Sequence, residues 1–149
     1  MICDYDGHNQ KSVVESQTKI LGPEFSPCGR YLLYRTLHDK AGQTLFLYDF
    51  KNRSNLNLSD YMLRRCNYIV GKNISTAVFG RNSSEILFAK SNQGTTSIKA
   101  LDFGSSTVRD AVSRQQYHIH TCPTYSPSGH LTFTSDISGR EAIYVEQNG

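Results

Sequence analysis

Two histidines and a cysteine at alternating positions come closest to a metal site in this chain. His118, His120 and Cys122 are each separated by one residue, so on a β-strand their side chains would share one face. Imidazole nitrogens and thiolates are preferred ligands of zinc. No further ligand is clearly placed beside them, and the other three cysteines, Cys3, Cys28 and Cys66, form no close pair. We therefore expect no metal and no cofactor.

A second group has the residue types of a serine hydrolase. Ser126, His130, Ser135 and Asp136 lie close together in the sequence and could supply a nucleophile, a base and an acid. A hydrolase nucleophile usually sits in a Gly-x-Ser-x-Gly turn, and the chain has no such motif. Ser126 instead belongs to a turn sequence that recurs elsewhere. The sequence predicts a protein that is not an enzyme.

That turn sequence occurs three times and indicates an internal repeat. The copies are Pro-Glu-Phe-Ser-Pro-Cys-Gly at 23–29, a degenerate Ala-Val-Phe-Gly-Arg-Asn-Ser at 77–83, and Pro-Thr-Tyr-Ser-Pro-Ser-Gly at 123–129. Their intervals are close to the roughly 40 to 50 residues of one propeller blade. The middle copy has lost both prolines and the glycine. We expect it to follow the same path with a looser corner.

Each copy is followed by two short apolar segments. Such runs, bounded by Gly, Asn, Ser and Asp, are typical of β-strands. The expected strands are 31–34, 45–48, 86–88, 98–102, 131–133 and 142–146. Asp49, Asp102 and Asp136 follow or end strands, where a carboxylate can accept backbone N–H bonds in the next turn. The helix-like stretch 59–66 is interpreted as a short turn between blades.

The fold class predicted is therefore all-β, a β-propeller fragment of roughly two and a half to three four-stranded antiparallel blades. The expected boundaries are residues 1–18 for the end of one blade, 19–60 and 61–113 for two blades, and 114–149 for an incomplete one. Open blade edges would invite self-association. We expect the isolated chain to be marginally stable, self-associating or aggregation-prone.

Composition excludes two classes of partner. The net charge is only +3, and no run of Lys or Arg interleaves with aromatic residues, so the sequence predicts no nucleic-acid binding. No apolar stretch approaches the roughly 20 residues needed to cross a bilayer, so no membrane span is expected. No signal peptide is recognisable at the start.

The chain resembles the propeller domain of the TolB family. The opening Asp-x-Asp-Gly-x-Asn segment favours this family over other propellers that share the turn sequence. The similarity also includes Phe-Thr-Ser-Asp and Ile-Tyr-Val sequences near the end. The residues that carry it are 4–10, 23–29, 123–129, 133–136 and 143–145.

The resemblance implies a six-bladed periplasmic propeller behind an N-terminal α/β domain, of which about half the propeller is present here. Members of the family bind the lipoprotein Pal and act with other Tol proteins in outer-membrane integrity and cell division. Family residues just before the repeated turn sequence make the Pal contact. By position they correspond to Gly22, Asn73, Thr76 and Thr121. Asn73 stands where the family often has His, Thr76 where it has Ala, and Cys122 where a carboxylate is common.

Two other interpretations remain open. The blades of prolyl-oligopeptidase-like serine hydrolases carry a similar Ser-Pro-Asp-Gly sequence, so the chain could be part of such a regulatory propeller. It could also be a degraded fragment without function, because the middle turn is degenerate and half of the propeller is missing. Alternatively, a second chain supplies the missing blades. The favoured hypothesis is a noncatalytic protein-interaction module.

Overall fold

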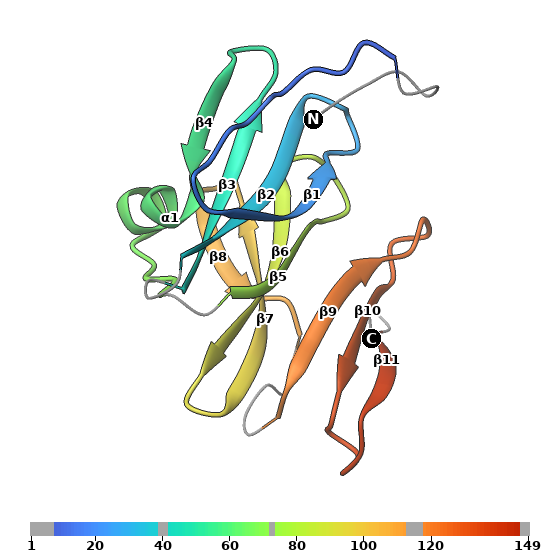
Figure 1. The fold of residues 1–149 in the computed structure, drawn as a ribbon. Helices are drawn as coiled ribbons and strands as arrows, with labels where there is room; N and C mark the ends of the chain where they lie inside the picture. Colours follow the sequence, from blue (N-terminus) through green and yellow to red (C-terminus); the bar gives the residue numbers. More distant parts are fainter. Residues whose placement is uncertain (1–7, 39–41, 72–73, 113–117, 147–149) are drawn as a thin grey trace.

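A computed structural model describes residues 8–38, 42–71, 74–112 and 118–146. Three antiparallel sheets lie side by side, here called blades 1 to 3 in chain order (Figure 1). Blade 1 contains β1 (Lys19–Phe25), β2 (Tyr31–His38), β3 (Gly42–Asp49) and β4 (Ser54–Asn57). Blade 2 contains β5 (Ile74–Phe79), β6 (Glu85–Asn92), β7 (Thr95–Asp102) and β8 (Thr107–Asp110). Blade 3 contains β9 (His120–Tyr125), β10 (Leu131–Ser135) and β11 (Ala142–Glu146).

The prediction of an all-β propeller fragment is confirmed. Each sheet is a meander in which sequential strands pair antiparallel, as in a propeller blade. In the described part of residues 1–18, which the sequence assigns to the end of another blade, no strand forms, and Lys11 makes a single isolated bridge. None of the described helices is both long and apolar enough to span a membrane.

The stretch interpreted as a turn between blades is a helix, α1 (Leu58–Cys66). Asn57 caps it, because its side-chain oxygen accepts from the N–H groups of Ser59 and Asp60 at 3.0 and 3.2 Å. Asn67 ends it in the left-handed conformation, with φ of 50°. Burial of Leu58 and Met62 fixes the helix to blades 1 and 2, which local sequence could not reveal.

Two apolar cores form where the blades face each other. Because side chains alternate along a strand, each blade presents one apolar set to the preceding blade and another to the following blade. Leu33, Leu45 and Leu47 of blade 1 pack with Ile86 and Phe88 of blade 2. The second core lies between blades 2 and 3 and contains Leu87, Ile98, Ala100, Leu131 and Phe133. The blades are therefore held together by packing between sheets.

Each of the three repeated turns is closed by a backbone hydrogen bond, and the third turn is one residue shorter than the other two. The N–H groups of Ser26, Gly80 and Ser126 donate to the carbonyls of Tyr31, Glu85 and His130 at 2.9, 2.8 and 2.9 Å. The hydroxyls of Ser26 and Ser126 each accept a further N–H bond, which Gly80 cannot replace. In the degenerate copy the Asn82 side chain accepts from the N–H of Ser84 at 2.9 Å. The same path is kept with different turn chemistry.

The three recurring aspartates differ in what they bind. Asp49 accepts from the N–H groups of Lys51 and Asn52, and Asp102 accepts from Ser105, as expected for a carboxylate in a following turn. Asp136 instead accepts from the N–H of Ile119, which lies just before β9. That bond lowers the pKa of Asp136. The third aspartate therefore fixes the start of blade 3 and departs from the expected role.

Replacing Asp49 by asparagine should lower stability in a pH-dependent way. Arg30 binds both oxygens of Asp49, at 3.0 and 2.7 Å, and these hydrogen bonds hold the pKa of Asp49 far below its ordinary value. When the pKa of a carboxyl is lower in the folded than in the unfolded chain, its ionised form stabilises the fold at pH values above the unfolded pKa, which is about 3.9 for Asp. This stabilisation is lost as the pH falls through the folded pKa. The melting temperature of Asp49→Asn should lie below that of wild type at pH 7, and this difference should shrink below about pH 4.

The exposed carboxylate Glu141 provides the control for this measurement. Glu141→Gln should melt close to wild type at every pH tested. A melting-temperature difference for Asp49→Asn that is constant from pH 7 to pH 3 would contradict the assigned role of the Arg30 pair.

Candidate functional site

The innermost strand of every blade carries a bulge near the start of the repeated turn sequence, and the bulge in β5 begins one residue earlier than those in β1 and β9. Its register shifts between Leu21 and Glu24 in β1, between Ile74 and Thr76 in β5, and between Thr121 and Thr124 in β9. A bulge inserts one residue and turns the following side chains. The strands β1, β5 and β9 also contact one another in order. The bulges therefore form a row along the inner side of the three blades.

Gly22 is required by the bulge in β1. Its φ is +55°, and a Cβ there would lie 3.0 Å from Nη2 of Arg35. The Arg35 guanidinium donates to Oε1 of Gln43 at 2.8 Å and to the carbonyl of Ser75 in β5. Burial lowers the pKa of Arg35. Arg35 thus joins the bulges of blades 1 and 2. In the sequence, the only sign of this role is that Arg35 is a single arginine within an apolar strand.

Three of the four residues predicted to bind a partner lie in or beside these bulges. Gly22 is exposed, and Thr121 is half-buried opposite Thr134. Thr76 is also half-buried, and its Oγ1 atom is buried without a hydrogen-bond partner among the described residues. Asn73, the fourth, lies outside the described residues. The positions inferred from the family resemblance therefore share one structural feature of the blades.

The bulge in β9 separates Cys122 from the two histidines that suggested a metal site, whose ring centroids lie 6.2 Å apart. His120 is fully buried and packs edge-on against Phe133, with ring centroids 5.4 Å apart. Cys122, expected on the same face if the alternation continued, has φ of +50° and is exposed. His118 lies 3.5 Å from Asp136. The described residues contain no group of three or more His, Cys, Asp or Glu side chains that could hold a metal.

The residues that suggested a serine hydrolase do not come together as a catalytic group. The hydroxyl of Ser126 lies 2.8 Å from that of Ser128, which in turn lies 2.9 Å from Nδ1 of His130. The five residues of β10 separate His130 from Asp136, which contacts His118 at the other end of that strand. A triad needs the acid beside the imidazole. Ser126 and His130 therefore stabilise the repeated turn through these hydrogen bonds.

Cys28 has the most perturbed thiol among the described cysteines. Its Sγ lies 3.4 Å from the hydroxyl of Ser26, and its N–H donates to the hydroxyl of Ser83 in the next blade. The hydroxyl of Ser26, followed by that of Ser83, lowers the pKa of Cys28 to about 7. Burial raises the pKa of Cys66. Because Cys28 is exposed, its thiolate is accessible to solvent near neutral pH.

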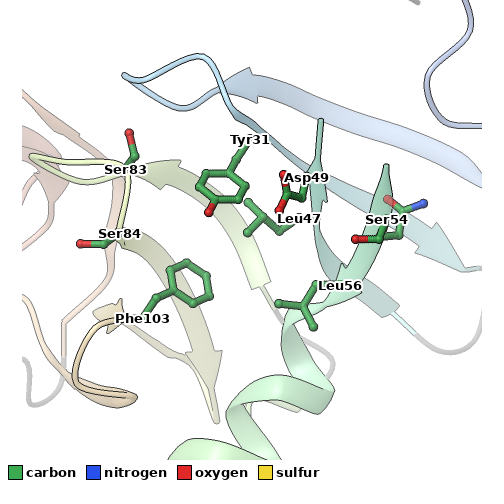
Figure 2. A pocket seen from close by; sticks show the side chains of 9 residues that line it. Tyr31, Leu47, Asp49, Ser54, Leu56, Ser83, Ser84 and Phe103 are labelled. Carbon is green, nitrogen blue, oxygen red and sulfur yellow. The ribbon is translucent and has the colours of Figure 1, made fainter. Parts of the chain in front are cut away.

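An apolar pocket of about 510 Å³ lies between the outer parts of blades 1 and 2 (Figure 2). Tyr31, Leu47, Leu56 and Phe103 surround it, with serine hydroxyls at its rim. Its walls come from the ends of the blades where the repeated turns lie. The inner-strand bulges belong to a different part of the blades, so this pocket is separate from the predicted partner-binding residues.

A family model, described as the TolB beta propeller domain, matches residues 1–149. The chain belongs to the TolB β-propeller family. The Tol-Pal system protein TolB of Actinobacillus pleuropneumoniae serotype 5b is 38% identical over 53 residues, which are 36% of this chain and 12% of that protein. The same identity and coverage hold for TolB of serotype 3. The sequence similarity therefore spans a small part of these relatives.

Solved structures show the same fold over more of the chain. TolB from Acinetobacter baumannii superimposes with a TM-score of 0.74 at 23% identity, over 99% of this chain and 34% of that one. An oligogalacturonate lyase in complex with manganese gives a TM-score of 0.64 at 15% identity, over 94% of this chain and 38% of the lyase. A puromycin hydrolase also gives 0.64, at 11% identity, over 91% and 23%. At these identities the likeness establishes the propeller fold alone.

Proposed function

We propose that this TolB-like propeller segment is a noncatalytic interaction module that binds the lipoprotein Pal through the bulged starts of its innermost strands. The observation that carries the proposal is that the innermost strand of each blade has a bulge in or beside the positions that the family resemblance assigns to partner contact. A bulge in each inner strand brings residues that are at least partly exposed to the same side of the three blades, where one ligand could contact them. Gly22 and Cys122 are exposed there, and Thr76 and Thr121 are half-buried.

The wider role that we propose is supported by the name of the matched relatives alone. The matched protein of Actinobacillus pleuropneumoniae is named for the Tol-Pal system. We place this chain in that system, in the periplasm, with Pal and other Tol proteins as its partners and support of outer-membrane integrity and cell division as its outcome. Asn73 is included in the binding face on the resemblance alone. The separation of Ser126 and His130 from Asp136 supports a role without catalysis.

Binding should be measured by light scattering and titration calorimetry on the purified chain with a soluble Pal domain. We expect a defined complex whose dissociation constant rises at least about tenfold in Thr121→Trp, equivalent to about 1.4 kcal/mol. The reason is steric, because Thr121 is only half-buried beside the β9 bulge. Circular dichroism would verify that the variant keeps its sheets.

Thr107→Trp is the matched control, because Thr107 is exposed on the outermost strand of blade 2. It should bind Pal as wild type does. Absence of any complex with the wild-type chain would contradict the proposal. So would equal weakening by Thr107→Trp and Thr121→Trp, since the effect would then not depend on the bulges.

A further inference from the structure

Arg35 is a partly buried cation that has no carboxylate partner among the described residues. Its exposure is intermediate, and burial lowers its pKa because the charged form loses part of its water shell. The ion pairs of the described residues all belong to other cations: Arg30 with Asp49, Lys99 with Asp110, Arg109 with Glu85, and His118 with Asp136. A partly desolvated charge without a counter-charge is costly, and binding a carboxylate offsets that cost.

The hydrogen bonds of Arg35 leave one edge of its guanidinium open. Nη1 donates to Oε1 of Gln43 at 2.8 Å and to the carbonyl of Ser75, so both of its N–H groups are used. The N–H groups on Nε and Nη2 make no hydrogen bond to any described residue. Nε–H and one N–H of Nη2 point from the same side of the planar guanidinium, where they match the oxygens of a carboxylate.

Arg30 shows how the same edge is used elsewhere in blade 1. Its Nε and Nη2 donate to Oδ1 and Oδ2 of Asp49 at 3.0 and 2.7 Å. This is the bidentate pairing that arginine and carboxylate prefer. Arg35 presents the same edge while its Nη1 is already fixed to blades 1 and 2, so the guanidinium is held in place before a carboxylate arrives.

Gly22 keeps space free beside the open edge. A Cβ at Gly22 would lie 3.0 Å from Nη2 and 3.7 Å from Nε of Arg35. Because glycine has no side chain, that position is empty, and Gly22 itself is exposed. The open edge therefore lies beside an exposed part of the β1 bulge.

We propose that the Nε and Nη2 edge of Arg35 binds a carboxylate of the partner that docks on the inner-strand bulges, and that Gly22 leaves the room for it. The inference rests on the proposed function and deepens it by naming the chemistry of one contact. Two predicted contact positions flank Arg35, since Gly22 lies beside the open edge and Ser75, whose carbonyl Arg35 binds, precedes Thr76. The residues that form the site belong to blades 1 and 2, which both have four described strands.

Nuclear magnetic resonance of the Arg35 Nε–H group tests the site on the chain alone. The probe is acetate, and acetamide is the matched neutral control. At constant ionic strength, we expect the Arg35 Nε–H signal to move saturably with acetate and to stay unchanged with acetamide. The Nε–H signal of Arg30 should not respond to acetate, because Asp49 already occupies its edge. Arg35→Gln assigns the signal by removing it.

The soluble Pal domain tests the same edge in a complex. Adding it to the wild-type chain should move the Arg35 Nε–H signal, a measurement that needs no substitution. By titration calorimetry, Arg35→Gln should raise the dissociation constant at least about tenfold, because a charge-assisted pair of hydrogen bonds is lost. Arg35→Lys keeps the charge without the planar edge and should restore little of the affinity.

Arg64→Gln is the matched control for the calorimetry. It removes the same charge from an exposed position in the last turn of α1 and should bind Pal as wild type does. Circular dichroism would verify that all three variants keep their sheets.

Several results would overturn this inference and leave the proposed function in place. They are an Arg35 Nε–H signal that ignores acetate or responds equally to acetamide, a Pal complex that leaves the signal unmoved, and equal Pal affinity of wild type and Arg35→Gln. The opposite combination separates the two proposals. A saturable response to acetate without any Pal complex would contradict the proposed function and still establish the carboxylate site.

Discussion

Replacing Leu33 by alanine is expected to lower the free energy of unfolding by about 2–5 kcal/mol. Leu33 is 0% exposed and lies in the core between blades 1 and 2, beside Leu45 and Leu47. Removing its side chain loses apolar burial and leaves a cavity that packed sheets fill only in part. The free energy of unfolding of a small domain is about 5–15 kcal/mol in total, so this loss should remove a large fraction of it.

Urea denaturation followed by circular dichroism measures the effect. Leu63→Ala makes the same chemical change at a position that is 51% exposed on α1 and should shift stability by less than about 0.5 kcal/mol. If Leu33→Ala and Leu63→Ala lost equal amounts, packing between blades 1 and 2 would not be what holds them together.

Replacing Gly80 by alanine should lower the free energy of unfolding by about 1–3 kcal/mol through overpacking. A Cβ at Gly80 would lie 2.3 Å from Oε1 and 2.7 Å from Cγ of Glu85, far inside contact distance. Glu85 is buried, and its other oxygen, Oε2, accepts from Nη2 of Arg109 at 2.6 Å. Moving the Glu85 side chain would break this ion pair and leave a carboxylate in poor contact with water, which adds to the cost.

Gly104→Ala is the control, because a Cβ there meets only an oxygen of Asp102 at 3.2 Å. Thermal melts of both variants should show a much larger loss for Gly80→Ala. Adding Glu85→Ala to Gly80→Ala should cost less than the sum of the two single changes, since the contacts with Oε1 and Cγ are then removed and only the one with Cβ of residue 85, at 2.8 Å, remains. Additive losses would contradict the steric explanation.

Sequence alone determined the fold class and the turns of this protein. Apolar segments of strand length, separated by turns rich in Pro, Gly, Asn and Ser, encode short antiparallel strands locally. The repeated turn sequence then set the blade as the unit, because a turn closed by a backbone hydrogen bond recurs at 26–31, 80–85 and, one residue shorter, 126–130. The capped helix α1 was visible only as a helix-like stretch, since burial against two blades stabilises it.

Tertiary structure alone decided which side chains reach the inner face of the blades. Strict alternation places His120 and Cys122 together, but the bulge in β9 buries one and exposes the other. A bulge depends on pairing with the neighbouring strand, which a linear pattern does not contain. The bond from Arg35 to Ser75 and the pair of Glu85 with Arg109 likewise join residues far apart in the chain. Such contacts exist only once the sheets have formed and packed, because packing brings distant residues together.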